Sequence, residues 1–157
     1  MHRESLASQE YAPQGLHPEA SAAAQRSADY AASLRRIRIL LADDHKIMRQ
    51  GLMALLGCEP DLEVVGEAAD GQASVEMTLS IRPDVVVMDV GMPVLNGVEA
   101  TRIITSEIPG IRVIGLSMYD EASRATAMID AGAAAYLNKA GPSEELISTI
   151  RFLGRKP

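Results

Sequence analysis

Aromatic residues, cysteines and long apolar runs are scarce or absent in this sequence. Its 157 residues include no tryptophan and one phenylalanine, Phe152, so no row of rings is present on which nucleic-acid bases would stack. A single cysteine, Cys58, excludes an internal disulfide and a cysteine-rich zinc site. No apolar run reaches the length of a membrane span, and the N-terminus lacks the apolar segment of a secretory signal peptide. We therefore expect a cytoplasmic protein without a membrane partner.

Positive charge is also scarce. The formal net charge is −6, and the longest basic stretch is the pentapeptide LRRIR at 34–38. A surface with excess negative charge repels the phosphate backbone of nucleic acids, so we expect the domain to bind DNA or RNA poorly by itself.

The first 35 residues differ in composition from the remainder of the chain. They are rich in Ala, Ser and Gln, and the part from 19 to 36 has enough alanine to favour a helix. Alanine offers little apolar area to bury, so marginal order is favoured. We interpret 1–35 as a tail or linker that is partly helical or disordered, 36–154 as a folded domain, and 155–157 as the start of a linker or the C-terminal end.

From residue 36 onward, apolar runs alternate with segments of helical periodicity. The central runs, such as DVVVMD, are apolar without alternation, as in parallel strands that are covered on both faces. Five strand–helix units are too few for an eight-unit barrel, so we predict a flavodoxin-like, doubly wound α/β sheet of order 2-1-3-4-5. The predicted strands are 37–42, 62–68, 84–89, 112–117 and 133–138, and the predicted helices are 46–57 (with Gly57 as C-cap), 70–81 (opened by Asp70), 96–108, 120–131 (opened by Asp120) and 142–154.

Polar residues occupy the ends of four of these strands. Asp43 and Asp44 follow the first strand, Asp89 ends the third, Ser117 ends the fourth, and Lys139 follows the fifth. In the predicted order, these strand ends converge on one crevice beside the switch point of the sheet. The sequence therefore predicts a small pocket that contains three carboxylates, a hydroxyl and an ammonium group.

Such a pocket has a definite chemistry. Three close carboxylates cannot all remain charged without a cation. We expect an all-oxygen cluster with no histidine or cysteine nearby, which favours a hard ion such as Mg²⁺ over zinc. A lysine and a serine beside the ion suit phosphate oxygens, and a carboxylate can accept a phosphoryl group as an acyl phosphate. We therefore predict a magnesium-dependent phosphoryl-acceptor site.

Four segments closely resemble the receiver domains of bacterial two-component response regulators, especially the NarL/FixJ group. They are LLADDHKIMRQGLMALL, PDVVVMDVGMPVLNGVEATR, VIGLSMYDE and GAAAYLNKAGPSEELISTIR, and the resemblance spans roughly 37–153. It implies phosphorylation by a sensor histidine kinase, Mg²⁺ as cofactor, and a signalling rather than a turnover role. The residues that it implies are Asp89 as phosphoryl acceptor, Asp43, Asp44, Asp89 and the backbone carbonyl of Gly91 as metal ligands, Ser117 as switch hydroxyl, Lys139 as phosphate-binding lysine and Tyr136 as switch aromatic.

The output of such a regulator lies outside the matching region. NarL/FixJ regulators normally carry a helix-turn-helix domain after the receiver, whereas this sequence ends at Pro157. It is either the receiver part of a longer regulator or a single-domain receiver with an N-terminal extension. We expect any DNA contact to occur through an output domain that is absent here, and a homodimer to form, if at all, through one face of the receiver.

Two other interpretations are weighed beside this one. A magnesium-dependent aspartyl-phosphate hydrolase usually has a second acid two residues after its nucleophile, where this sequence has Gly91. An interaction module that is never phosphorylated would not need the complete acceptor set.

The segment GLSMY also partly resembles a serine-hydrolase elbow, but no histidine follows Ser117. His45, a weak candidate base, is interpreted as a surface residue that opens the first helix of the domain.

Overall fold

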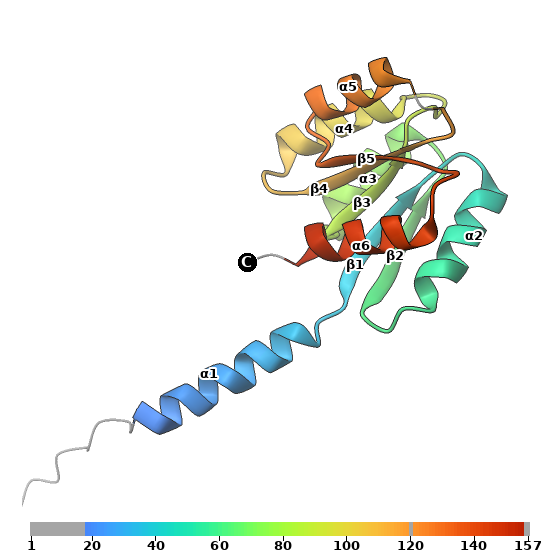
Figure 1. Cartoon of the computed structure of the whole chain (residues 1–157). Coiled ribbons are helices and arrows are strands. Elements are labelled where there is room, and N and C mark those ends of the chain that lie inside the picture. Colours follow the sequence, from blue (N-terminus) through green and yellow to red (C-terminus); the bar gives the residue numbers. More distant parts are fainter. Residues whose placement is uncertain (1–17, 120, 156–157) are drawn as a thin grey trace, which may run out of the picture. The chain divides into compact units, whose positions relative to one another are not determined.

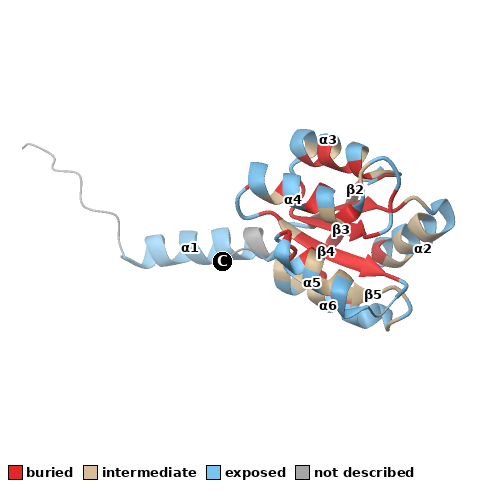
Figure 2. Ribbon diagram, turned by 90° about the horizontal axis from the view of Figure 1, so that it is seen from above, coloured by how far each residue is buried: buried red, intermediate tan, exposed pale blue. Residues whose placement is uncertain are grey.

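The computed structural model describes residues 18–119 and 121–155, and the chain divides into two compact units, residues 1–35 and 36–157. In the first unit, helix α1 spans Pro18–Ser33 and is rich in alanine, the residue with the highest helix propensity. The side chains of residues 18–30 are all exposed (Figure 2). This helix therefore has no buried apolar face of its own over those residues.

The second unit is built on one parallel sheet of five strands (Figure 1). Its order is β2-β1-β3-β4-β5, which confirms the predicted doubly wound topology. Every neighbouring pair is parallel, so all carboxyl ends lie at one edge of the sheet. The strands are β1 Ile37–Ala42, β2 Leu62–Ala68, β3 Val85–Asp89, β4 Arg112–Ser117 and β5 Ala135–Asn138.

Helices cover both faces of this sheet and form two separate apolar layers. One layer packs α3, α4 and α5 on Leu40 and Met88, and the other packs α2 and α6 on Leu41 and Val87. Successive residues of a strand point to opposite faces, which explains why the central strands are apolar throughout (Figure 2). The helices are α2 Lys46–Gly57, α3 Gly71–Ile81, α4 Gly97–Glu107, α5 Ala122–Asp130 and α6 Ser143–Gly154.

Side-chain caps explain where two of the helices begin. The carboxylate of Asp70 accepts a hydrogen bond from the amide of Ala73, as predicted for an N-cap. Asn96 and Glu99 form a reciprocal capping box at the start of α4. These local signals fix the positions at which α3 and α4 leave the carboxyl edge of the sheet.

Several predicted boundaries differ from the structure. Helix α2 continues through Gly57, because Cys58 stays in the right-handed region and its amide closes the last turn on Leu55 and Leu56. The predicted fifth strand begins at 133, but the amide of Ala133 bonds to Met128 at the end of α5, so β5 starts at Ala135. Asp120, the predicted start of the fourth helix of the domain, lies outside the described residues, and α5 begins after Glu121.

Among the described residues, no helix has both the length and the apolar character needed to cross a membrane.

Candidate metal centre

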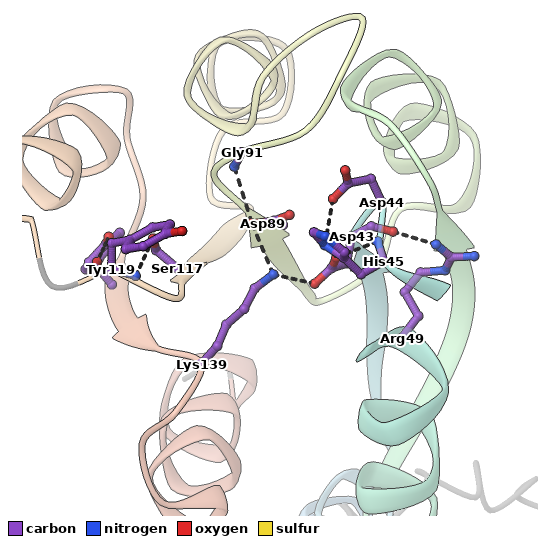
Figure 3. Close-up of polar contacts among 10 residues, drawn as sticks. Asp43, Asp44, His45, Arg49, Asp89, Gly91, Ser117, Tyr119 and Lys139 are labelled. Atoms are coloured by element: carbon purple, nitrogen blue, oxygen red, sulfur yellow. Dashed lines mark hydrogen bonds and ion pairs between the residues drawn. The ribbon is translucent and has the colours of Figure 1, made fainter. Parts of the chain in front are cut away.

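The carboxyl edge of the sheet brings together the residues that were predicted to share a pocket (Figure 3). Asp43 follows β1, Asp89 is the last residue of β3, Ser117 is the last residue of β4, and Lys139 follows β5. The side chains of Asp43, Asp89 and Ser117 are buried. Parallel pairing of β1, β3, β4 and β5 in that spatial order accounts for their convergence.

Lys139 connects two of the carboxylates. Its Nζ lies 2.6 Å from Oδ2 of Asp43 and 3.2 Å from Oδ1 of Asp89. All three side chains are almost fully buried, so water screens these ion pairs little. Three carboxylates and one ammonium group leave two negative charges, which a single divalent cation would balance.

His45 belongs to the same cluster, although the sequence analysis treated it only as a surface residue. It does open α2 and its side chain is exposed, but Nδ1 of its ring lies 3.2 Å from Oδ1 of Asp43 and 3.1 Å from Oδ1 of Asp44. Ligand atoms of Asp43, Asp44, His45 and Asp89 all lie within 4.8 Å of one another, a group that could hold a metal ion. The expectation that no histidine lies near the carboxylates was therefore wrong.

Oδ1 of Asp44 is the most informative atom of this group. It is buried, and within the described part of the chain it has no hydrogen-bond donor, because the nearby imidazole nitrogen lacks hydrogen-bond geometry. A buried carboxylate oxygen without a donor is costly. A cation at this point would satisfy the oxygen, so the residues present fit a hard divalent ion such as Mg²⁺.

Burial also alters the acid–base behaviour of the central carboxylate. The pKa of Asp89 is raised above its ordinary value, chiefly because burial penalises the charged form. The negative charge of Asp43 raises this pKa further, and the ammonium group of Lys139 opposes both effects. An additional positive charge beside Asp89 would favour its ionised form.

The loop after β3 is held close to Asp89. The amide of Gly91 donates to Oδ1 of Asp89 at 3.3 Å, and Gly91 itself is exposed. At the start of α4, a Cβ atom on Gly97 would lie 2.1 Å from the backbone oxygen of Asp89. Only glycine allows α4 to begin this close to the backbone of Asp89.

Arg49 is a contributor that the sequence analysis missed. It lies one turn into α2, and its Nη1 donates to the backbone oxygen of Asp43 at 2.6 Å. Its Nε also pairs with Glu67 near the end of β2, at 3.3 Å. Arg49 therefore fixes the backbone that carries the acid pair. A basic residue one turn after an acid pair is the only signal of this role in the sequence.

Ser117 and Tyr136 meet at a residue that was not predicted. The backbone amide of Tyr119 donates to Oγ of Ser117 at 3.2 Å, and the hydroxyl of Tyr136 donates to the backbone oxygen of Tyr119 at 3.1 Å. The guanidinium of Arg124 lies 5.2 Å from the centre of the Tyr119 ring, within cation–π range. The backbone of Tyr119 thus joins the buried serine to the tyrosine of β5.

Comparison with known proteins gives consistent matches. The profile of the response regulator receiver domain matches residues 39–151. The transcriptional regulatory protein DegU of Brevibacillus brevis is 38% identical over 120 residues, which cover 76% of this chain and 51% of DegU. The transcriptional regulatory protein LiaR of Bacillus subtilis is 40% identical over 115 residues, which cover 73% of this chain and 54% of LiaR. The chain therefore spans about half the length of the curated relatives it matches.

Solved structures match over the same region. The response regulator domain of Thermotoga maritima CheB has a TM-score of 0.71 at 35% identity, covering 78% of this chain and 100% of that domain. A LuxR-family two-component response regulator from Aurantimonas sp. SI85-9A1 has a TM-score of 0.72 at 35% identity, covering 74% of this chain and 84% of that chain. The signal receiver domain of NarL from Mycobacterium tuberculosis has a TM-score of 0.69 at 30% identity, covering 77% and 99%.

Proposed function

Since the chain belongs to the response regulator receiver domain family and its relatives are of the NarL/FixJ type, we propose that it accepts a phosphoryl group on Asp89 from a sensor histidine kinase. The phosphorylated domain then changes its surface and controls an output. In this role the domain promotes its own phosphorylation and dephosphorylation but does not turn over outside substrates.

The position of Asp89 is the observation that carries this proposal. Its carboxylate ends the central strand β3, faces Asp43 and shares the ammonium group of Lys139. Lys139 can follow a phosphoryl oxygen once the acceptor is modified, because it is a point charge on a flexible stem. The Gly91 amide, 3.3 Å from Oδ1 of Asp89, is a second donor for the same charge.

The transfer itself is a simple displacement. A carboxylate oxygen of Asp89 attacks the phosphorus of a phosphohistidine, and a P–O bond forms as the P–N bond breaks. The electron pair of the P–N bond returns to the imidazole nitrogen of the donor, and Asp89 becomes an acyl phosphate. Positioning and charge neutralisation account for most of the rate in such transfers.

Mg²⁺ is the cofactor that we assign to the acidic cluster. The carboxylates of Asp43, Asp44 and Asp89 would hold it together with the backbone carbonyl of Gly91, and the buried, unbonded Oδ1 of Asp44 supports this assignment. When bound, the ion neutralises negative charge on the phosphoryl oxygens. The acceptor is then held in position by Lys139, Asp43 and Arg49.

The signal is proposed to travel through Ser117 and Tyr136. A phosphoryl group on Asp89 adds oxygens that need donors, and Ser117 at the next strand end is the nearest hydroxyl that the topology offers. If Ser117 moves toward that group, its hydrogen bond with the Tyr119 amide must change, and so must the bond from Tyr136 to Tyr119. The face formed by α5, β5 and α6 would then favour a different conformation.

The output is proposed to be transcription. The relatives DegU and LiaR are transcriptional regulatory proteins, and this chain covers about half of each. DNA would be bound by an output domain outside this sequence, in keeping with the net charge of −6 here. The reshaped α5–β5–α6 face would release such a domain or pair with a second copy of the receiver.

Phosphoryl stoichiometry separates this function from its rivals. With a small phosphodonor and Mg²⁺, labelling should level off near one phosphoryl group per chain, and phosphomonoesters should not be turned over. Continuous release of phosphate from phosphomonoesters would instead support an aspartyl-phosphate hydrolase. A protein that gains no label under these conditions would support the interaction module that is never phosphorylated.

A further inference from the structure

We propose that the receiver forms a twofold homodimer in which Phe152 of each copy fills an apolar hollow between α2 and α6 of the other copy. The two α6 helices run antiparallel in this pair. The inference is independent of the proposed function, because it requires neither phosphorylation of Asp89 nor a metal ion. It assigns a contact surface on the α2 side of α6, and its partner is a second copy of this chain.

The hollow is the first argument. It lies between α2 and α6, which cover the same face of the sheet (Figure 1). Three residues that share one side of α2 form one wall, and all three are only half-buried. The apolar residues that line the hollow are Met48, Leu52 and Leu55 of α2, Leu116 of β4, Leu137 of β5 and Leu146 of α6. An apolar side chain inserted from outside would therefore remove further apolar area from water.

Phe152 is the second argument. This residue is the single phenylalanine of the chain, yet its side chain is 82% exposed on α6. It cannot fill the hollow of its own copy, because it lies roughly 9 Å along α6 from Leu146 and on the outer side of that helix. An aromatic ring that enters a pocket is a typical anchor of an interface. The ring is thus placed for a hollow on another molecule.

The register of α6 brings the ring and the hollow together. When an antiparallel pair is centred on Ser148, Phe152 lies opposite Glu144 of the other copy, because both are equally far from the centre. The hollow opens beside this first turn, where Glu145 and Leu146 line it. Phe152 follows Glu145 by two helical turns, so both lie on the same side of α6. Ser148 is exposed and small, which lets the two helices approach to about 8–10 Å.

The charges on α6 select the antiparallel arrangement. Its first turn carries Glu144 and Glu145, whereas Arg151 lies in its last turn and Arg155 follows it. The side chain of Arg155 is 70% exposed and its contact with Asp61 is long, at 3.7 Å, so its guanidinium can reach the acidic first turn of the other copy. A parallel pair would instead place like charges together. The contact is therefore self-complementary, because each copy inserts one ring and receives one.

Sedimentation equilibrium of the full chain, without phosphodonor or divalent ions, measures the pairing. One helix and one hollow make a small contact, so we expect a weak dimer with a Kd of about 1 μM to 1 mM. Phe152→Ser should raise this Kd at least about tenfold, because the ring anchors the contact. Ile129→Ser is the matched control. It changes an exposed apolar residue of α5, on the opposite face of the sheet, and should alter the Kd less than about threefold.

Cross-linking tests the register separately. In a Cys58→Ser background, Ser148→Cys leaves one thiol per chain, next to the twofold axis. A disulfide requires Cα atoms within about 7 Å, so mild oxidation should join two copies only if the α6 helices pack at this residue. Ser123→Cys, at an exposed position in α5, should remain largely monomeric under the same oxidation.

The results separate this interface from others. A wild-type chain that stays monomeric up to about 1 mM overturns the inference, and so does a Kd that Phe152→Ser leaves unchanged. A Kd that rises more in Ile129→Ser than in Phe152→Ser overturns it as well, because the pairing would then lie on α5. Cross-linking of Ser123→Cys as efficient as that of Ser148→Cys contradicts the antiparallel α6 pair. None of these results alters the proposed function.

Discussion

The ammonium group of Lys139 lies 2.6 Å from the carboxylate of Asp43, and both side chains are only 3% exposed. The two residues follow β5 and β1, strands that are separated in the sheet by β3 and β4. Their contact therefore crosses the end of β3, where Asp89 lies 3.2 Å from the same nitrogen. One buried cation thus links the ends of three strands at the proposed phosphorylation site.

Loss of that cation should destabilise the fold. In Lys139→Met, two buried carboxylates lose their partner, and the free energy of unfolding should fall by roughly 3–5 kcal/mol, as for other broken buried ion pairs. Urea denaturation without divalent ions measures the change. Lys46→Met, at an exposed position in α2, is the control and should change stability by less than about 0.5 kcal/mol. Equal stability of the two variants would contradict the role of Lys139.

Mg²⁺ should stabilise the protein through Asp44. At a hundredfold excess over Kd, binding adds about 2.7 kcal/mol to the free energy of unfolding, which raises Tm by about 5–11 °C. Asp44→Asn should lose most of this shift. Without Mg²⁺ it should be more stable than the wild type, because a buried, unbonded carboxylate charge is removed.

Thermal melts with and without Mg²⁺ measure both effects. Asp130→Asn, an exposed change in α5, should keep the wild-type shift. A full Mg²⁺ shift in Asp44→Asn would exclude Asp44 as a ligand.

Stability should depend on pH through Asp61, which lies outside the site. Nε of Arg151 donates to Oδ2 of Asp61 at 2.8 Å, and this hydrogen bond lowers the pKa of Asp61. The stabilisation is therefore fully present above the pKa of about 4 in the unfolded chain and is lost as the pH falls through the lower pKa of the folded state. Because both side chains are about one-third exposed, we expect about 1 kcal/mol or less.

Arg151→Gln measures this contribution. The destabilisation of this variant relative to the wild type should be constant between about pH 5 and 7, because the pKa of Asp61 in the unfolded chain is about 4. The destabilisation should shrink as the pH falls below that value. Urea midpoints across the range give the curve, with Arg102→Gln, exposed in α4, as the control. A difference that grows toward acid pH would reverse the assigned sign.

Ser117 should matter more for transmission of the signal than for phosphorylation itself. Ser117→Ala keeps the acceptor and the acids, so it should still be labelled, but backbone amide shifts of residues 117–153 on adding a phosphoryl mimic should be reduced. Tyr136→Phe removes only the 3.1 Å bond to Tyr119 and should reduce shifts around that residue. If both variants shift as the wild type does, the coupling follows a different route.

Much of the fold was predictable from local patterns. Apolar runs without alternation predicted the central strands, and Asp70 predicted the start of one helix. The apolar spacing gave wrong predictions where tertiary contacts determine which residues are buried. Ile47 fits the apolar spacing of α2, yet its side chain is 85% exposed.

The site was predictable only where side chains follow strand ends. Asp43, Asp89, Ser117 and Lys139 converge because parallel strands share one carboxyl edge, a property of topology alone. The contacts of His45, Arg49 and Tyr119 depend on loop conformation and on backbone atoms, which residue identity does not encode. The metal ligation, the phosphorylation and the role of each residue therefore stay predictions.

Phosphorylation of Asp89 is the claim on which the account depends, and mapping the label by mass spectrometry tests it most directly. The chain is incubated with acetyl phosphate and Mg²⁺, the acyl phosphate is reduced with borohydride, and the modified peptide is sequenced. The account predicts one modification per chain, at Asp89, with full loss in Asp89→Asn and normal labelling in Asp130→Asn. A label that persists in Asp89→Asn, or that maps to Asp43 or Asp44 in the wild type, would contradict it.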